Sequence, residues 1–286
     1  DNLWEAVYRM QKEMDNMTEE IDEMTSEMEE MQERINELEN MTSCRLVPYS
    51  NCAGTDFNNR NLSGMDLTGI NFQNSDLAGA NLTNTDLRYT DLTRAYLLNA
   101  DLTNTDLRYA DLTNADLESA DLAEANLIHA DLTNAKLWYA DLTNAYLTFA
   151  VLTGASFYSA DLEDATLYYA DLTGAYLDYS DLTDAHFNFA DLTRANFQDA
   201  DLTSADFFNA VLTNADFEDA DLTGADLDSA DLTNANFQDA DLTNADLNYA
   251  DLTNANFQDA DLEDATLSEA DLKFAKFSGA TVTDAN

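Results

Sequence analysis

The sequence predicts an all-β solenoid preceded by a long α-helix, and three observations predict it. From residue 55 onward an apolar residue occupies every position ending in 2 or 7. Phe57 to Val282 in steps of five gives 46 such positions. Ala stands two positions before most of them, and Asp or Asn stands one position before. Residues 1–41 carry a heptad pattern instead. A period of five fits neither an amphipathic helix nor a two-sided strand, and it is typical of solenoids.

Within each repeat only the Ala and the Leu or Phe are regularly apolar, so these two residues share one interior. Coils with flat sides that turn both residues inward satisfy this pattern and stack at the β-spacing of ~4.8 Å. Burial of one Leu contributes about 1.5–3 kcal/mol, whereas ordering five residues costs about 1–2 kcal/mol each. One repeat therefore does not fold alone, and we expect stability to come from stacking between coils.

The tandem motif, written in full at Ala130–Asn134, resembles that of the pentapeptide-repeat family over residues 55–286. The resemblance implies a right-handed quadrilateral β-helix with four repeats per coil, hence about 11.5 coils and a rod ~55 Å long. Four early repeats replace the Ala, at Thr55, Arg60, Met65 and Ile70. We therefore expect the first coil to be irregular.

Residues 1–41 are predicted to form one α-helix ~60 Å long, because two apolar series alternate every three and four residues without Gly or Pro. The seam consists of Leu3, Val7, Met10, Met14, Met17, Ile21, Met24, Met28, Met31, Ile35 and Leu38. A narrow apolar seam needs a partner, and the leading interpretation is a coiled coil with helices of other copies. The many Met side chains leave a second interpretation open, in which the helix packs along a rod.

Residues 42–54 form a linker that contains the only two cysteines, Cys44 and Cys52. We expect a disulfide between them, worth about 2–3 kcal/mol, and an oxidising compartment, extracellular or periplasmic. The alternative is two reduced thiols in the cytoplasm. The chain begins at Asp1 without Met, which fits a removed signal peptide. Four glycosylation sequons begin at Asn16, Asn40, Asn61 and Asn81.

The chain is strongly acidic, with 57 acidic and 12 basic residues and a net charge of −45. This charge excludes nucleic-acid binding through phosphates and suits cations or basic partners. No segment has the length and apolarity of a membrane span.

Residues twenty apart share one face of such a rod, and two opposite faces carry outward aromatic residues. One face holds the column Tyr109, His129, Phe149, Tyr169 and Phe189, and the other holds Trp138, Tyr139, Tyr158, Tyr176 and Tyr179. We interpret both groups as contact surfaces. Stacking that merely stiffens the rod is the alternative.

Two further columns are regular. Asp199, Asp219, Asp239 and Asp259 stack beside Gln198, Glu218, Gln238 and Gln258. Their mutual repulsion suggests bound Ca²⁺, and a solvated, screened column is the alternative. Nine threonines twenty apart, from Thr93 to Thr253, suit either a β-strand or an ice-binding array.

No catalytic constellation is present, because His129 and His186 lie at variable outward positions and no nucleophile or phosphate-loop motif occurs. The leading hypothesis is a non-enzymatic, self-assembling protein outside the cytoplasm that forms filaments by head-to-tail stacking and helix contacts. The resemblance implies an alternative, since some family members are acidic rods that imitate DNA and bind a type II topoisomerase (gyrase). Ice binding and a passive coiled-coil stalk or adhesin are further alternatives.

Overall fold

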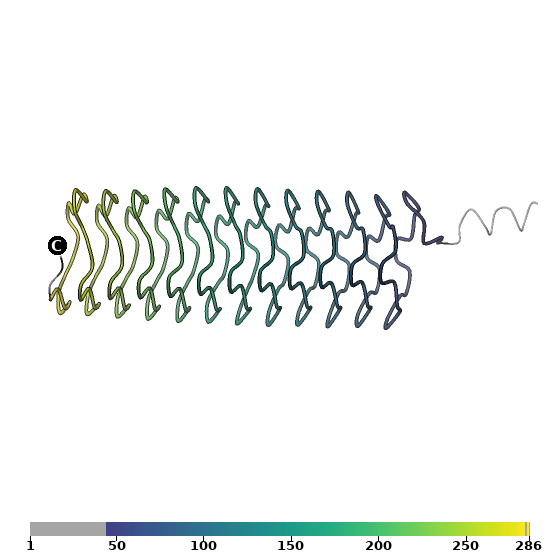
Figure 1. The fold of residues 1–286 in the computed structure, drawn as a ribbon, viewed down its shortest axis with the longest axis horizontal. Helices are drawn as coiled ribbons and strands as arrows, with labels where there is room; N and C mark the ends of the chain where they lie inside the picture. The colour runs from purple at the N-terminus through teal and green to yellow at the C-terminus, as the bar shows by residue number, and fades with distance from the viewer. Residues whose placement is uncertain (1–43, 284, 286) are drawn as a thin grey trace, which may run out of the picture. The chain divides into compact units, whose positions relative to one another are not determined.

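The computed structural model describes residues 44–283 and 285. The chain divides into two compact units, Asp1–Cys44 and Arg45–Asn286. The predicted helix at 1–41, its seam and the sequons at Asn16 and Asn40 lie outside the described residues and stay predictions. The second unit winds into stacked coils (Figure 1).

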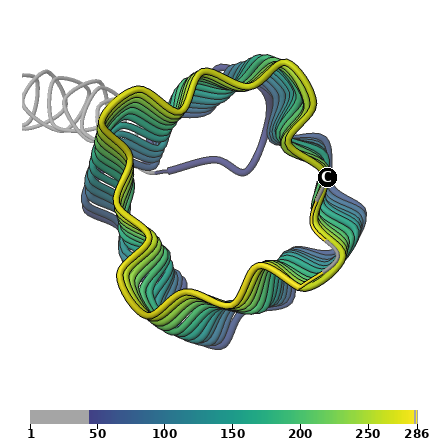
Figure 2. The same cartoon turned by 90° about the vertical axis from the view of Figure 1, so that its left-hand side faces the viewer.

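Pairing between coils joins residues twenty apart, so four five-residue repeats complete one coil, as expected. Single parallel bridges run from Asn51↔Asn71 to Asp261↔Thr281. The described residues contain no helix and no strand longer than one bridge, because every bridge is followed by a two-residue turn. Figure 2 looks down the stack and shows these turns superimposed from coil to coil.

The stack begins earlier than the five-residue pattern suggests. Asn51 already forms a bridge, and Cys52 occupies the central core position, where 1% of its surface is exposed. The expectation of an irregular first coil is wrong for the backbone, since Asp56↔Asp76 and Asn61↔Asn81 keep the same register. Backbone hydrogen bonds between coils hold this register, and they do not require Ala. Both cysteines are disulfide-bonded, which confirms the predicted pair.

A repeat with the full motif pairs all of its backbone N–H groups, as the repeat 131–135 shows. Three of its five N–H groups donate to carbonyls of adjacent coils at 2.7–3.0 Å. The N–H of Ala135 closes a turn onto the carbonyl of Leu132 at 2.9 Å. The remaining N–H, on Thr133, donates to Oδ1 of Asp131 at 2.9 Å. Unpaired backbone groups are expensive, so the Asp or Asn of the motif acts as the turn's acceptor.

The fourth residue of nearly every repeat adopts a left-handed conformation, with φ near +60° at Asn134 (φ 55) and Gly154 (φ 66) alike. Gly tolerates this conformation freely, and Asn and Asp tolerate it better than other residues. This preference explains why the fourth residue of the repeat is so often Asn, Asp or Gly.

The core consists of the Leu, Phe and Ala positions, which are almost fully buried from Phe72 to Ala265. In the C-terminal half it contains a continuous ring stack, in which neighbouring centroids from Phe197 through Phe257 are 4.8 Å apart and nearly parallel. Where a hydroxyl replaces the Ala it finds a carbonyl, as Ser75 Oγ does on Cys52 at 2.9 Å. The filled interior leaves functional chemistry to the outer faces.

Candidate functional site

One outer face carries a continuous aromatic ladder. Its rings belong to Tyr89, Tyr109, His129, Phe149, Tyr169 and Phe189. Consecutive centroids lie 4.9–5.1 Å apart and the planes differ by 5–13°. The tyrosines and phenylalanines of the ladder keep 45–57% of their surface exposed. The predicted column is therefore an exposed stack, and Tyr89 extends it by one coil.

All six ladder residues occupy the left-handed turn position, with φ between 58° and 61°. An aromatic side chain has none of the local compensation that favours Asn or Gly there. Six successive coils therefore carry an aromatic residue where Asn or Gly would form the same turn with less backbone strain. Backbone strain of this kind is concentrated at functional sites in proteins.

The opposite face, half a coil away, carries an aromatic hollow of about 410 Å³. It is lined by Trp138, Tyr139, Ser156, Tyr158, Tyr176 and Asp178. Four of the aromatic residues predicted for this face meet here. Tyr179, the fifth, contacts the ring of Tyr158 at a centroid distance of 5.4 Å.

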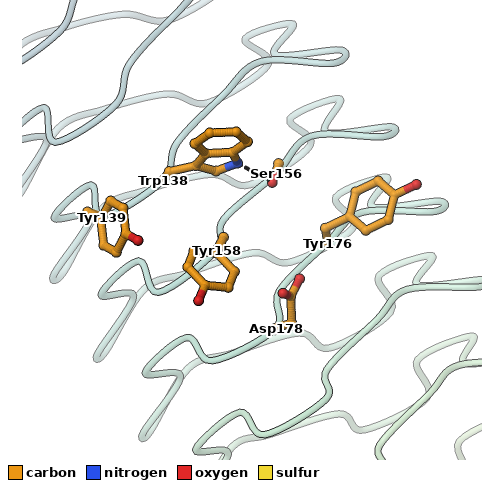
Figure 3. A pocket seen from close by; sticks show the side chains of 6 residues that line it. All are labelled: Trp138, Tyr139, Ser156, Tyr158, Tyr176 and Asp178. Atoms are coloured by element: carbon orange, nitrogen blue, oxygen red, sulfur yellow. Dashed lines mark hydrogen bonds between the residues drawn. The ribbon is translucent and has the colours of Figure 1, made fainter.

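Rings in the aromatic hollow are held at steep angles rather than stacked. Tyr139 and Tyr158 meet edge to face at 5.7 Å and 89°. The Trp138 indole N–H donates to Ser156 Oγ at 2.6 Å, which fixes the indole (Figure 3). In Figure 3 the Asp178 carboxylate lies between the rings of Tyr158 and Tyr176.

Charges border the aromatic hollow on two sides. Lys136 Nζ lies 3.3 Å from an oxygen of Asp116 and 5.9 Å from the centroid of Trp138. A hydrogen bond to Asp199 raises the pKa of the Tyr179 phenol, and the charge of the same carboxylate adds to the shift.

The turn acceptor is missing in the aromatic hollow and in the second half of the aromatic ladder. Twelve repeats from Asn51 onward lack Asp or Asn at that position, and seven of the twelve fall between residues 136 and 186. Among them, Lys136, Ser156 and Tyr176 share the face of the aromatic hollow. Consequently the N–H groups of Trp138 and Tyr158 have no acceptor within the described part of the chain, unlike Thr133.

The acidic column is present beside its amides. Gln238 Nε2 donates to Asp239 at 3.0 Å, and Gln258 Nε2 donates to Asp259 at 3.1 Å. In the described residues no three His, Cys, Asp or Glu side chains converge as metal ligands would. The Ca²⁺ site predicted at Asp199, Asp219, Asp239 and Asp259 stays a prediction.

The threonine column does not lie on a strand, because these residues occupy the first turn position of each repeat. Thr133 Oγ1, for example, donates to Asp131 at 2.6 Å. The strand explanation is therefore wrong, and ice binding stays a prediction. The histidines are both outward, as expected: His129 in the aromatic ladder, and His186 with Nδ1 3.9 Å from Asp206. Over residues 44–283, no helix has the length and apolarity needed to cross a membrane.

Sequence reasoning missed Tyr89, Ser156 and Asp178. Tyr89 was detectable, since it lies twenty residues before Tyr109 in the same column. Ser156 and its neighbour in the next coil, Tyr176, were detectable as departures from Asp or Asn. Asp178 resembles many other acidic residues, and only the geometry distinguishes it.

Comparisons with known proteins agree with the repeat pattern. Models described as pentapeptide repeats match several overlapping segments between residues 50 and 209, and a pentapeptide repeat region model matches residues 210–286. No curated protein matches the chain at a significant level.

Several solved structures resemble the chain. HetL, a pentapeptide repeat protein involved in heterocyst differentiation regulation from the cyanobacterium Nostoc sp. strain PCC 7120, is 31% identical over 88% of this chain and 94% of its own, with a TM-score of 0.25. QnrB1, a plasmid-mediated fluoroquinolone resistance protein, is 16% identical over 66% of this chain and 84% of its own, with a TM-score of 0.37. A pentapeptide repeat protein from the Arabidopsis thaliana thylakoid lumen is 37% identical over 34% of this chain and 64% of its own, with a TM-score of 0.21.

The family assignment rests on the repeat models, which together match segments from residue 50 to residue 286. Proteins with these repeats form right-handed quadrilateral β-helices, in agreement with the twenty-residue register. The chain belongs to the pentapeptide-repeat family.

Proposed function

We propose that this chain is a non-enzymatic structural protein that assembles with further copies of itself through the aromatic ladder. The observation that carries the proposal is the ladder's place on the turn: six successive rings, about half exposed, occupy positions that Asn or Gly would fill with less strain. An exposed apolar strip of this kind suits a protein interface.

Stiffening of a single rod does not account for the aromatic ladder. Its five ring contacts contribute about 0.5–1.5 kcal/mol each. Six left-handed residues cost about 1–2 kcal/mol each. Over most of these ranges the strain exceeds the stacking energy, so stacking alone is a weak reason for a lone rod to keep the rings.

A second copy fits the aromatic ladder because two like-charged rods repel least where carboxylates are few or, as at Asp86 and Asp106, paired with arginine. The residue before each ladder ring carries no acid: these residues are Arg88, Arg108, Ile128, Thr148, Tyr168 and Asn188. Two identical ladders share the same spacing between rings, so they match ring for ring in a self-complementary contact. Head-to-tail stacking and pairing of the predicted helix at 1–41 would extend such pairs into filaments.

The test is the double variant Tyr109→Asn with Phe149→Asn in the full chain, measured by sedimentation velocity at rising concentration. Asn suits the turn, so we expect an unchanged or higher melting temperature and association at least about tenfold weaker, or 1.4 kcal/mol. The matched control is Tyr249→Asn, which removes an exposed ring from the same column outside the ladder. Wild-type protein that stays monomeric at high concentration would contradict self-assembly.

A second candidate function is binding to a type II topoisomerase as an imitation of DNA. The observation that favours it is an unbroken column of aspartates twenty residues apart, from Asp101 to Asp261, which bridge in register. A gyrase supercoiling assay with added rod tests this candidate. Inhibition that disappears at high salt supports it, and full activity at excess rod opposes it.

We also propose an extracellular or periplasmic location. The disulfide-bonded state of Cys44 and Cys52 supports it, because such bonds persist in oxidising compartments. Thiol titration of protein recovered from its native cells is the test, and two free thiols per chain would argue for the cytoplasm.

A further inference from the structure

We propose that the aromatic hollow binds an alkylammonium cation, the chemical group shared by choline-like molecules and by lysine side chains, methylated lysine included. The site combines four aromatic rings with one carboxylate in a concave space of about 410 Å³. The proposal concerns the face opposite the aromatic ladder and does not depend on self-assembly.

Ring orientation is the first step of the argument. In the aromatic ladder the four inner rings each have a parallel neighbour on both faces, so their edges are the available parts. In the aromatic hollow Tyr139 and Tyr158 stand at 89° to each other, and Tyr158 and Tyr179 at 64°. In such pairs the edge of one ring meets one face of the other, and the remaining ring faces are not stacked on a parallel neighbour. Those faces carry the negative part of the ring quadrupole, which attracts cations.

Charge is the second step. Among the described residues, Asp178 is the one carboxylate that lines the aromatic hollow, and the one basic group at its border, Lys136, is paired with Asp116 at 3.3 Å. The Asp178 carboxylate lies among the rings (Figure 3). The chain's net charge of −45 adds a long-range attraction for cations and repels anions.

The structure already holds one ammonium group against this aromatic surface. Lys136 Nζ lies 5.9 Å from the Trp138 ring centroid while it pairs with Asp116 at 3.3 Å. Trp138 is in turn fixed by its bond to Ser156. The indole is therefore hydrogen-bonded in place, and one ammonium group already lies within about 6 Å of its ring centroid.

The repeat pattern is the third step. Ser156 and Tyr176 stand where the turn requires Asp or Asn, and both line the aromatic hollow. Each leaves the following turn without its usual acceptor. Asp at these two positions would complete the turns. It would also remove the hydroxyl of Ser156 that binds the Trp138 indole and the ring of Tyr176 that lines the hollow.

The experiment is a fluorescence titration of the full chain with choline chloride at constant ionic strength. A Trp4→Phe background leaves Trp138 as the single tryptophan. We expect saturable quenching with a Kd in the range of about 1–10 mM. The neutral isostere 3,3-dimethylbutan-1-ol is expected to bind at least about tenfold more weakly, because it lacks the charge.

Two variants with a matched control locate the site. Asp178→Asn and Tyr176→Ala are each expected to weaken choline binding about five- to tenfold. Asp228→Asn changes the same turn position on the opposite face and is expected to leave binding unchanged. Thermal melting followed by circular dichroism verifies that each variant is folded.

The outcomes separate the explanations. Equal affinity for choline and its isostere, or an unchanged Kd in Asp178→Asn, overturns the proposal. Quenching by glucose without quenching by choline also overturns it and indicates a sugar site. A short peptide with a central trimethyllysine serves as a second probe: tighter binding than choline points to a protein partner, and weaker binding points to a small molecule.

Discussion

Asp141 offers the sharpest test of what the acidic residue of the repeat does. Its Oδ1 accepts the Thr143 N–H at 2.9 Å and the Thr143 hydroxyl at 2.6 Å. The same carboxylate lies between Asp121 and Asp161 of the adjacent coils, with which its backbone forms bridges. One side chain thus combines a favourable acceptor with two unfavourable like charges, and two substitutions separate these effects.

Asp141→Asn keeps the acceptor and removes the charge. At a spacing of ~4.8 Å each neighbouring carboxylate repels by roughly 1 kcal/mol in water. We therefore expect Asn to stabilise by up to about 1–2 kcal/mol at low salt, with a gain that shrinks as salt screens the charges.

Asp141→Ala removes both the charge and the acceptor. Loss of a comparable capping acceptor costs about 0.5–2 kcal/mol, so Ala should be less stable than Asn by about 1 kcal/mol at every salt concentration. Urea unfolding gives the totals, and amide exchange at Thr143 gives the local effect, which should accelerate in Ala alone. Equal stability of the Ala and Asn variants, with equal protection of Thr143, would refute the reasoning.

Three further predictions concern the core, the linker and pH. Phe237→Leu removes two ring contacts at 4.8 Å and should lose about 1–3 kcal/mol in urea unfolding; a loss under about 0.5 kcal/mol would show that the ring stack adds little. Dithiothreitol should destabilise the wild type by about 2–3 kcal/mol and leave a Cys44→Ser, Cys52→Ser variant unaffected; no response in the wild type contradicts a stabilising disulfide. Burial, together with the charges of Asp206 and Asp246, raises the pKa of Asp226. Folded protein therefore holds this proton more readily than unfolded protein, and stability falls as pH rises through the raised pKa. Asp226→Asn should accordingly raise the melting temperature more at pH 7 than at pH 3; equal shifts at both would oppose this.

The sequence was sufficient for the fold because the period of five is also the period of the backbone. Every fifth residue meets the same neighbours, so the Leu and Ala positions identify the core without any knowledge of long-range contacts. The twenty-residue register came from the family resemblance, and the bridges confirm it. The five-residue pattern placed the start of the stack at residue 55, four residues after Asn51, which already forms a bridge.

The sequence predicted where the two aromatic surfaces lie but not how their rings are oriented. Columns twenty apart correctly grouped Tyr109 with Phe149 and Trp138 with Tyr158. Ring planes follow from side-chain rotamers, which no periodicity encodes. The sequence therefore could not tell the parallel aromatic ladder from the angled rings of the aromatic hollow, nor give Ser156 its role as the anchor of Trp138.

The hydrogen bonds also change what the acidity of this chain means. Because most turns use an Asp or Asn acceptor, many of the carboxylates occupy positions where they serve the fold itself. Charge alone is then a weak guide to partners, since a rod with no partner would carry it too. Two kinds of residue are more informative. Some, such as Tyr176, replace the Asp or Asn that accepts the turn's hydrogen bond. Others, such as Phe149, place an aromatic ring at the left-handed position. Neither feature adds stability to the turn, and both are concentrated between residues 136 and 189, so we propose that binding shaped the sequence in this part of the rod.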